Sequence, residues 1–197
     1  MNIIEKIYYK ISRLKFKFLI GKLGNRVCLR LEGRAIKGRY VEIDDDVVLG
    51  KDWVIAVYPE YCGIDMPVKQ EKIGVCIKSG VIANRKLTIY CAQGVEIGNN
   101  CMLGSNVLIT DNNHGMNVED VSYSKQSLIT KGKVIIGDEC WIGENVCILA
   151  GTSIGKRTII GAGSVVMGEI PGNSIVVGNP AKVIKKWNSN EHKWEKI

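Results

Sequence analysis

A six-residue repeat runs through residues 136–171 without a phase error. Each hexad opens with an aliphatic side chain, and its fifth position carries a small or aliphatic residue. An α-helix repeats its apolar positions about every 3.6 residues and a simple strand about every two, so neither element explains this period. A strict hexad predicts an all-β solenoid, a parallel β-helix whose repeated side chains point inward. The aliphatic residues that open the hexads are Ile136, Ile142, Ile148, Ile154, Ile160 and Val166.

The same phase occurs earlier in the chain. Hexads with inward positions run from Ile73 to Ile109, and a more degenerate stretch contains Ile43, Leu49 and Ile55. We therefore expect the solenoid to occupy residues 25–187. A single coil cannot bury its apolar side chains alone, so the stacking of coils supplies the core. A chain of 197 residues is then expected to form one domain with appendages.

Two segments, near 59–71 and 112–133, interrupt the repeat. Ile109 and Ile136 are 27 residues apart, which is not a multiple of six, so the phase cannot run through the second segment. We expect both segments to leave the solenoid as loops, and the second to be the one long ejected loop. Long loops on a rigid scaffold commonly carry function.

The first 24 residues differ from the rest in composition. Apolar residues from Ile3 to Phe18 recur at three- and four-residue spacing with basic residues opposite, which predicts an amphipathic basic helix over 1–24. Residues 1–39 hold eleven Lys or Arg against Glu5 and Glu32, in a chain of net charge +7. Residues 1–20 suit either an anionic membrane surface or, as we favour, packing against protein. Charge gathered at one end argues against a nucleic-acid partner.

The lengths of apolar runs and the spacing of cysteines indicate the cellular compartment, and the composition of the tail suggests its structure. No run of eighteen apolar residues occurs, so we expect a cytoplasmic protein, peripheral at the inner face of the membrane if the helix binds lipid. Seven cysteines form no C-x-x-C pair, and Cys91, Cys101 and Cys140 take inward positions, so neither a disulfide framework nor a zinc site is indicated. The polar tail, 188–197, follows Trp187 and contains Trp194. We interpret this tail as a short terminal helix.

Only two histidines occur in the chain. His192 lies in the tail, whereas His114 lies in Thr110-Asp-Asn-Asn-His-Gly at the root of the longer loop. Imidazole is the commonest general base near neutral pH. Asp111 is a candidate to orient that imidazole, although aspartate also suits a turn. Two histidines are too few for the three-histidine zinc site of a γ-type carbonic anhydrase on the same repeat.

Four motifs together carry a family resemblance over about residues 80–187. They are Ala83-Asn84 with Leu87-Thr88-Ile89, the hexads before His114, Cys140-Trp141-Ile142-Gly143, and 160–166 followed by 178–184. With them the chain resembles the left-handed parallel β-helix acyltransferases of the hexapeptide-repeat family. Within it, the chain is similar to sugar O-acetyltransferases of the galactoside and maltose type and to those acting on bacterial surface polysaccharides. The resemblance alone implies left-handed coiling.

The resemblance also implies roles for particular residues. His114 would take the proton from an acceptor hydroxyl while that oxygen attacks the thioester of acetyl-CoA, with Asn84 near the thioester and no acyl-enzyme. Coenzyme A would lie between neighbouring subunits of a homotrimer, Lys182 and Lys185 would attend its phosphates, and no metal is implied. Glu144 departs from the small polar residue of the galactoside-type relatives, which puts its role in doubt. The implied cofactor track comprises Trp141, Gly143, Glu144, Ala162, Met167, Gly168, Lys182 and Lys185.

The acceptor is specified least. Relatives that act on free sugars carry an acidic N-terminal segment, and this chain has a basic helix in its place. We therefore favour a bacterial surface polysaccharide or its lipid-linked precursor as acceptor. A sugar-nucleotide N-acetyltransferase is the main alternative, because it shares the scaffold, cofactor and histidine base. A non-catalytic solenoid scaffold is the least favoured reading.

Overall fold

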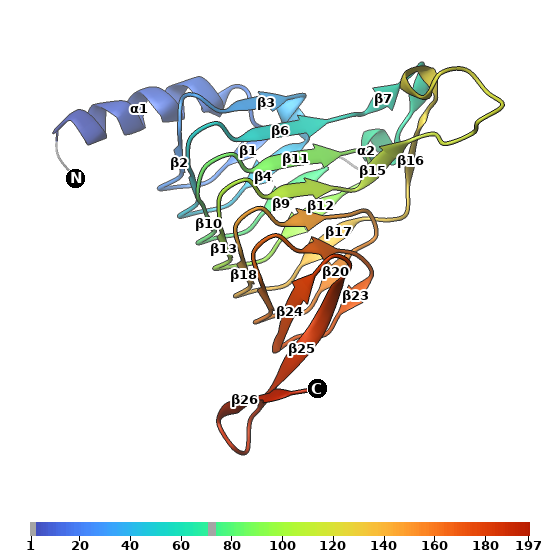
Figure 1. Ribbon diagram of the computed structural model, residues 1–197. Coiled ribbons are helices and arrows are strands. Elements are labelled where there is room, and N and C mark those ends of the chain that lie inside the picture. The colour runs from blue at the N-terminus through green and yellow to red at the C-terminus, as the bar shows by residue number, and fades with distance from the viewer. Residues whose placement is uncertain (1–2, 71–73) are drawn as a thin grey trace.

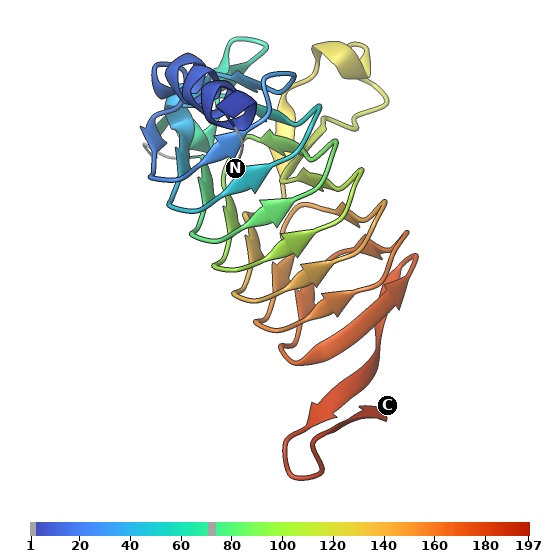
Figure 2. The same cartoon turned by 90° about the vertical axis from the view of Figure 1, so that its left-hand side faces the viewer.

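The computed structural model describes residues 3–70 and 74–197, with the side chains of residues 3–6 excepted. Parallel strands stack into a solenoid with three flat sides (Figures 1 and 2). In each coil the chain passes from a strand of sheet A to one of sheet B and then to one of sheet C. The hexad therefore sets one short strand and one corner per side, and the predicted β-helix is confirmed.

Sheets A and C form two of the sides. Sheet A is ordered β1 (Lys22–Leu23), β4 (Val41–Ile43), β9 (Val75–Ile77), β12 (Val95–Ile97), β17 (Val134–Ile136), β20 (Ser153–Ile154) and β23 (Glu169–Ile170). Sheet C is ordered β3 (Arg34–Ile36), β6 (Val54–Val57), β11 (Thr88–Cys91), β14 (Leu108–Thr110), β19 (Cys147–Ile148) and β22 (Val165–Val166).

Sheet B forms the third side and continues past the last coil. Its coil strands are β2 (Cys28–Leu29), β5 (Val48–Leu49), β10 (Ile82–Ala83), β13 (Met102–Leu103), β18 (Trp141–Ile142), β21 (Ile159–Ile160) and β24 (Ser174–Gly178). Two antiparallel strands follow, β25 (Ala181–Asn188) and β26 (Lys193–Lys196). The terminal helix interpreted from the sequence is therefore wrong. Trp187 and Trp194 instead pair across β25 and β26 with ring centroids 5.4 Å apart, as cross-strand aromatic residues commonly do.

The inward hexad positions form one continuous core. Ile97, Ile109 and Ile136 are fully or almost fully buried, as are the inward residues Cys91, Cys101 and Cys140. Hydroxyl residues replace aliphatic ones at three inward positions near the C-terminal end, and each donates a hydrogen bond to a corner carbonyl, which removes the cost of burying it. These bonds join Thr152 to Leu149, Thr158 to Gly155, and Ser164 to Gly161 at 2.6–2.7 Å.

Both interruptions of the repeat leave the solenoid at the same edge, between sheet C and sheet A (Figure 1). The first, between β6 and β9, contains the hairpin β7 (Glu60–Tyr61) and β8 (Ile64–Asp65) and the helix α2 (Pro67–Gln70). The second, between β14 and β17, contains β15 (Asn112–His114), a 3-10 turn (Tyr123–Lys125) and β16 (Leu128–Thr130). Strands β15 and β16 pair antiparallel, so the root of the long loop is ordered.

Helix α1 (Ile3–Lys17) lies on the first coil. It ends before the expected residue 24, because Lys22 and Leu23 already pair with β4 as strand β1. The buried Phe16 packs on Trp53 with ring centroids 5.0 Å apart, and the Ser12 hydroxyl donates to the Leu29 carbonyl. The expected apolar face therefore points away from the solenoid, leaving Ile7, Ile11, Leu14 and Phe18 exposed. Among the described helices, none is long and apolar enough to cross a bilayer.

Candidate active site

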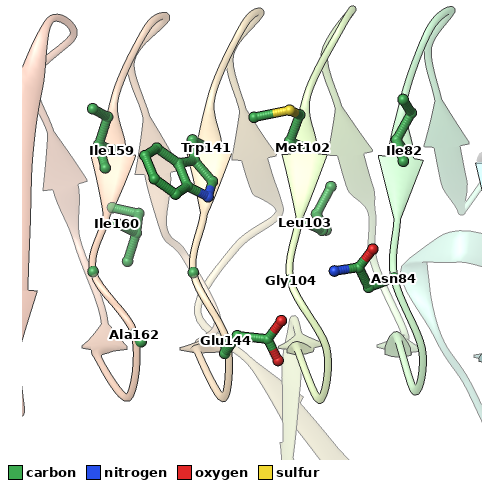
Figure 3. Close-up of a pocket in the computed structure, with 12 residues that line it drawn as sticks. Ile82, Asn84, Met102, Leu103, Gly104, Trp141, Glu144, Ile159, Ile160 and Ala162 are labelled. Atoms are coloured by element: carbon green, nitrogen blue, oxygen red, sulfur yellow. The ribbon is translucent and has the colours of Figure 1, made fainter.

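A shallow groove of about 530 Å³ crosses the outer face of sheet B (Figure 3). Its floor is an apolar ladder from β10, β13, β18 and β21, formed by residues that directly precede the inward aliphatic positions. One end is polar, where Asn84 and Glu144 lie on either side of Gly104. A mostly apolar cleft with a few polar groups is the usual composition of a small-molecule site. The ladder consists of Ile82, Met102, Trp141 and Ile159.

Five residues implied by the family resemblance line this one groove. Asn84 and Glu144 form the polar end, Trp141 belongs to the ladder, and Gly143 and Ala162 follow β18 and β21. Gly143 also has a structural reason to be glycine, because a Cβ there would lie 2.7 Å from the Ala162 backbone nitrogen of the next coil. Its small size therefore serves coil stacking whether or not a ligand approaches it.

Lys182 and Lys185 lie on the same face of sheet B as the groove, two strands beyond it. Strand β24 pairs with β21, and in β25 Lys182 pairs with Val177 while Lys185 pairs with Ile175. Directly paired residues share a face of a sheet. Ile175 pairs with Ile159, which lines the groove, so both lysines extend the groove face with positive charge.

His114, Met167 and Gly168 lie elsewhere. His114 is exposed in β15, and Met167 and Gly168 form the turn between β22 and β23. Both segments belong to the edge between sheets C and A, whereas the groove lies on sheet B, the opposite side of the solenoid. One copy of the chain therefore carries two separate sets of candidate residues and does not bring them together.

Asp111 does not orient His114. It is fully buried, and its carboxylate accepts hydrogen bonds from the backbone N–H groups of Ala92, Gln93 and Gly94 at 2.6–2.8 Å. The Asn112 side-chain amide donates to the same carboxylate at 2.9 Å. Asp111 therefore caps the neighbouring corner, and the orienting role expected from the sequence is wrong for this structure. Within the described residues, the imidazole makes no hydrogen bond, and its ring contact is with Tyr61 at 5.4 Å.

The loop that carries His114 is organised by Gln126, which sequence reasoning missed. This buried side chain accepts from the Asn117 N–H at 3.1 Å and donates to the carbonyls of Asn117 and Val121 at 2.8 and 2.7 Å. The first loop supports it, because the Tyr61 hydroxyl donates to the Ser124 carbonyl at 3.0 Å. Hexad phase carries no signal for these contacts. The apolar ladder did have a signal, since its residues are apolar at outward positions.

Comparison with known proteins agrees with this architecture. Residues 133–168 match the family model described as bacterial transferase hexapeptide (six repeats), and residues 89–120 match that of the hexapeptide repeat of succinyl-transferase. The chain is 38% identical over 128 residues, 62% of its own length, to a putative lipopolysaccharide biosynthesis O-acetyl transferase, WbbJ, of Escherichia coli. It spans 65%, 56% and 54% of the lengths of three curated relatives that it matches.

Two solved structures resemble this protein along most of its chain. A maltose O-acetyltransferase from Clostridium difficile has 28% identity and a TM-score of 0.59, with 90% of this chain and 75% of that chain covered. A mutant of AntD, an N-acyltransferase from Bacillus cereus in complex with a dTDP-amino sugar and coenzyme A, has 19% identity and a TM-score of 0.73. That match covers 93% of this chain and 91% of the other, and it bears on the fold alone.

The repeat, the three sheets and these likenesses define a left-handed parallel β-helix with a groove on one side and a histidine loop on another edge. Two stretches of the chain match hexapeptide-repeat family models, and the chain is similar to proteins named as sugar O-acetyltransferases.

Proposed function

We propose that the protein is an acetyl-CoA-dependent O-acetyltransferase whose acceptor is a sugar hydroxyl of a bacterial surface polysaccharide or its precursor. The observation that carries the proposal is the imidazole of His114, which is exposed on an ordered loop root and engaged by no hydrogen bond within the described residues. An imidazole in that state is available to accept a proton. The names of the relatives, which include O-acetyltransferases, support the same chemistry.

The proposed reaction is one direct transfer. His114 removes the proton of the acceptor hydroxyl as its oxygen attacks the thioester carbonyl carbon. The C–S bond then breaks, and the imidazolium returns the proton to the departing thiolate, so no acyl-enzyme forms. Asn84 supplies an amide N–H for the negative charge that develops on the carbonyl oxygen. Most of the acceleration comes from holding both substrates in line.

The groove on sheet B fits acetyl-CoA in its chemistry. The apolar ladder offers surface to the flexible arm of the cofactor, and the polar end at Asn84 and Glu144 suits the thioester end. Lys182 and Lys185 supply positive charge on the same face for the phosphates. These residues therefore offer all three chemical environments that the cofactor requires.

Thiol release from acetyl-CoA in the presence of free sugars, sugar nucleotides and lipid-linked glycans tests the activity. We expect release with a glycan acceptor and a product that mild alkali cleaves, as for an ester. A product that resists alkali is an amide, and it favours the alternative, a sugar-nucleotide N-acetyltransferase. If the protein binds no coenzyme A and acetylates no acceptor, the result favours a non-catalytic solenoid scaffold.

We further propose a homotrimer with its active sites between copies. The support is the division of the candidate residues, with Asn84 on the groove side and His114 on the opposite edge. A cyclic assembly places one copy's edge against the next copy's groove. Mixing His114→Ala chains with Asn84→Ala chains should then restore about a quarter of the wild-type sites by random assortment. Recovery is measured as thiol release, and no recovery in assemblies shown to be mixed contradicts shared sites.

The exposed stripe of α1 supports peripheral binding to an anionic membrane, where a lipid-linked precursor resides. Ile7, Ile11, Leu14 and Phe18 follow helical spacing on the face opposite the buried Ser12 and Phe16, and Phe18 is 81% exposed. Exposed lysines, Lys10 and Lys17, flank the stripe. Apolar residues that enter the lipid interface beside lysines that meet anionic headgroups are the features of an interfacial helix.

The double variant Ile11→Glu, Leu14→Glu should lower partition into phosphatidylserine-containing vesicles by at least about tenfold, because both side chains would bring charge into the interface. Co-sedimentation measures this effect, with phosphatidylcholine vesicles as the uncharged comparison. Val118→Glu, at an 81% exposed loop position, is the matched control and should leave partition unchanged. Wild-type protein that stays in the supernatant with both vesicle types rules out the membrane proposal.

A further inference from the structure

A row of aromatic rings runs from His114 across the edge of the solenoid. The Tyr61 ring meets the imidazole with centroids 5.4 Å apart and planes at 68°. Tyr58 meets Tyr61 edge-on at 6.4 Å, and Tyr90 meets Tyr58 at 6.4 Å. Tyr61 lies in β7, Tyr58 follows β6, and Tyr90 lies in β11 of sheet C (Figure 1). The aromatic surface therefore links the candidate base to the outer face of sheet C.

The far end of this row is not required by the core. In β11 the side chains alternate, so Ile89 and Cys91 are buried while Tyr90 points outward and is 38% exposed. Tyr58 and Tyr61 rest against the core on one side and remain half-buried. The Tyr58 hydroxyl is a hydrogen-bond donor at neutral pH, as in any tyrosine, and partial burial raises its pKa further. A half-exposed aromatic strip beside the proposed base has the composition typical of a ligand-binding surface.

The row ends at a shallow hollow of about 350 Å³ beside Tyr90. Thr88, Asn106 and Leu108 line the hollow, and so does the basic side chain of Lys86. A sugar ring presents apolar C–H faces and a rim of hydroxyl groups. Its faces pack on aromatic rings, and its hydroxyls pair with hydroxyl and amide side chains. The tyrosine rings of the row carry no formal charge, so they suit the C–H faces of a sugar, and Lys86 adds a donor for its hydroxyl groups.

We propose that Tyr61, Tyr58 and Tyr90 form the acceptor-glycan binding surface of this enzyme. The sugar that reacts lies at Tyr61, with one hydroxyl directed at His114, and a further sugar unit of the same glycan lies at Tyr90 and the hollow beside it. This inference rests on the proposed function and deepens it, because it assigns the surface that recognises the acceptor. Tyr61 also positions His114, through its ring contact and through its bond to Ser124.

The central variant is Tyr90→Ala, because Tyr90 faces outward and its loss leaves the core intact. We expect the KM for an oligosaccharide acceptor to rise about tenfold, with kcat and the KM for acetyl-CoA changed less than about twofold. Tyr90→Phe should restore the wild-type KM, whereas Tyr90→Leu should not, because it lacks an aromatic face. Tyr123→Ala is the matched control, a 55% exposed tyrosine of the His114 loop outside the row, and should leave the acceptor KM unchanged.

The measurement is thiol release, combined with saturation-transfer NMR for binding, on maltose, methyl β-galactoside and oligosaccharides released from bacterial O-polysaccharide. An unchanged acceptor KM in Tyr90→Ala, with an acceptor that the wild type uses, overturns this inference and leaves the proposed function standing. Wild-type protein that binds and acetylates none of these glycans, nor the lipid-linked acceptors, removes the proposed function and this inference together. Tyr61→Phe keeps the ring and loses the bond to Ser124, so a lower kcat at constant KM there isolates the positioning role.

Discussion

Replacing His114 by alanine is expected to reduce kcat for acetyl transfer by about 10²–10⁴-fold, the range by which a positioned general base accelerates a reaction. A sugar hydroxyl is a weak nucleophile until its proton is removed, and the proposed mechanism assigns that removal to the His114 imidazole. Affinity for acetyl-CoA should stay within about twofold, because the groove proposed to bind it lies on sheet B, away from His114. Thiol release gives kcat, and calorimetric titration with coenzyme A gives affinity.

His192→Ala is the matched control for this experiment. His192 is the other histidine of the chain and lies in the turn between β25 and β26, so its loss should change neither quantity. Full activity in His114→Ala contradicts a histidine base at this site. Loss of coenzyme A binding together with activity places His114 in cofactor binding rather than in proton transfer.

The sequence predicted the fold because the same requirement recurs at every hexad. A charged residue without hydrogen-bond partners at an inward hexad position would disrupt the stack, so the apolar period is visible even in the degenerate N-terminal coils. Loss of phase at 112–133 located the long loop for the same reason. The groove could also have been predicted from the sequence. Met102 and Trp141 are apolar at outward positions, where packing of the solenoid core does not require them.

Contacts between the two loops could not be predicted, because they depend on which edge each loop leaves. Tyr61 and His114 are 53 residues apart, and their contact arises because both loops leave between sheets C and A. The tail was misread because helix and strand periods are hard to distinguish in a short polar segment. In Lys193–Lys196 the pairing partner β25 decides for strand, and partner choice is a tertiary property.

Asp111 shows how a chemical pattern can mislead when strand geometry is ignored. Its position three residues before His114 favoured a catalytic pair. Yet Ile109 is buried and Thr110 is only partly buried, so strand alternation places Asp111 inward. A carboxylate directed inward at a corner needs several donors, and the N–H groups of residues 92–94 supply them. The alternation rule alone, applied to β14, predicts a structural role.

Asp111→Ala is accordingly expected to lower the free energy of unfolding by about 3–5 kcal/mol, since three backbone N–H groups lose a charged acceptor in a buried corner. The midpoint of thermal unfolding should fall by about 10 °C for a chain of this size. The stability of Asp111→Asn should lie between those of the wild type and Asp111→Ala, because an amide offers one acceptor oxygen where the carboxylate offers two. Differential scanning calorimetry measures the change, with the exposed neighbour Asn113→Ala as control.

The activity of the same variants separates the two roles of this aspartate. If Asp111 acts through stability, kcat measured well below the unfolding temperature should fall much less than in His114→Ala, because the imidazole keeps its contact with Tyr61. A wild-type melting temperature combined with a large loss of kcat is the opposite result, and it would return Asp111 to the catalytic group. The bonds to Ala92, Gln93 and Gly94 favour the first outcome, because a carboxylate already shared among three backbone donors has little capacity left to orient a side chain on an exposed strand.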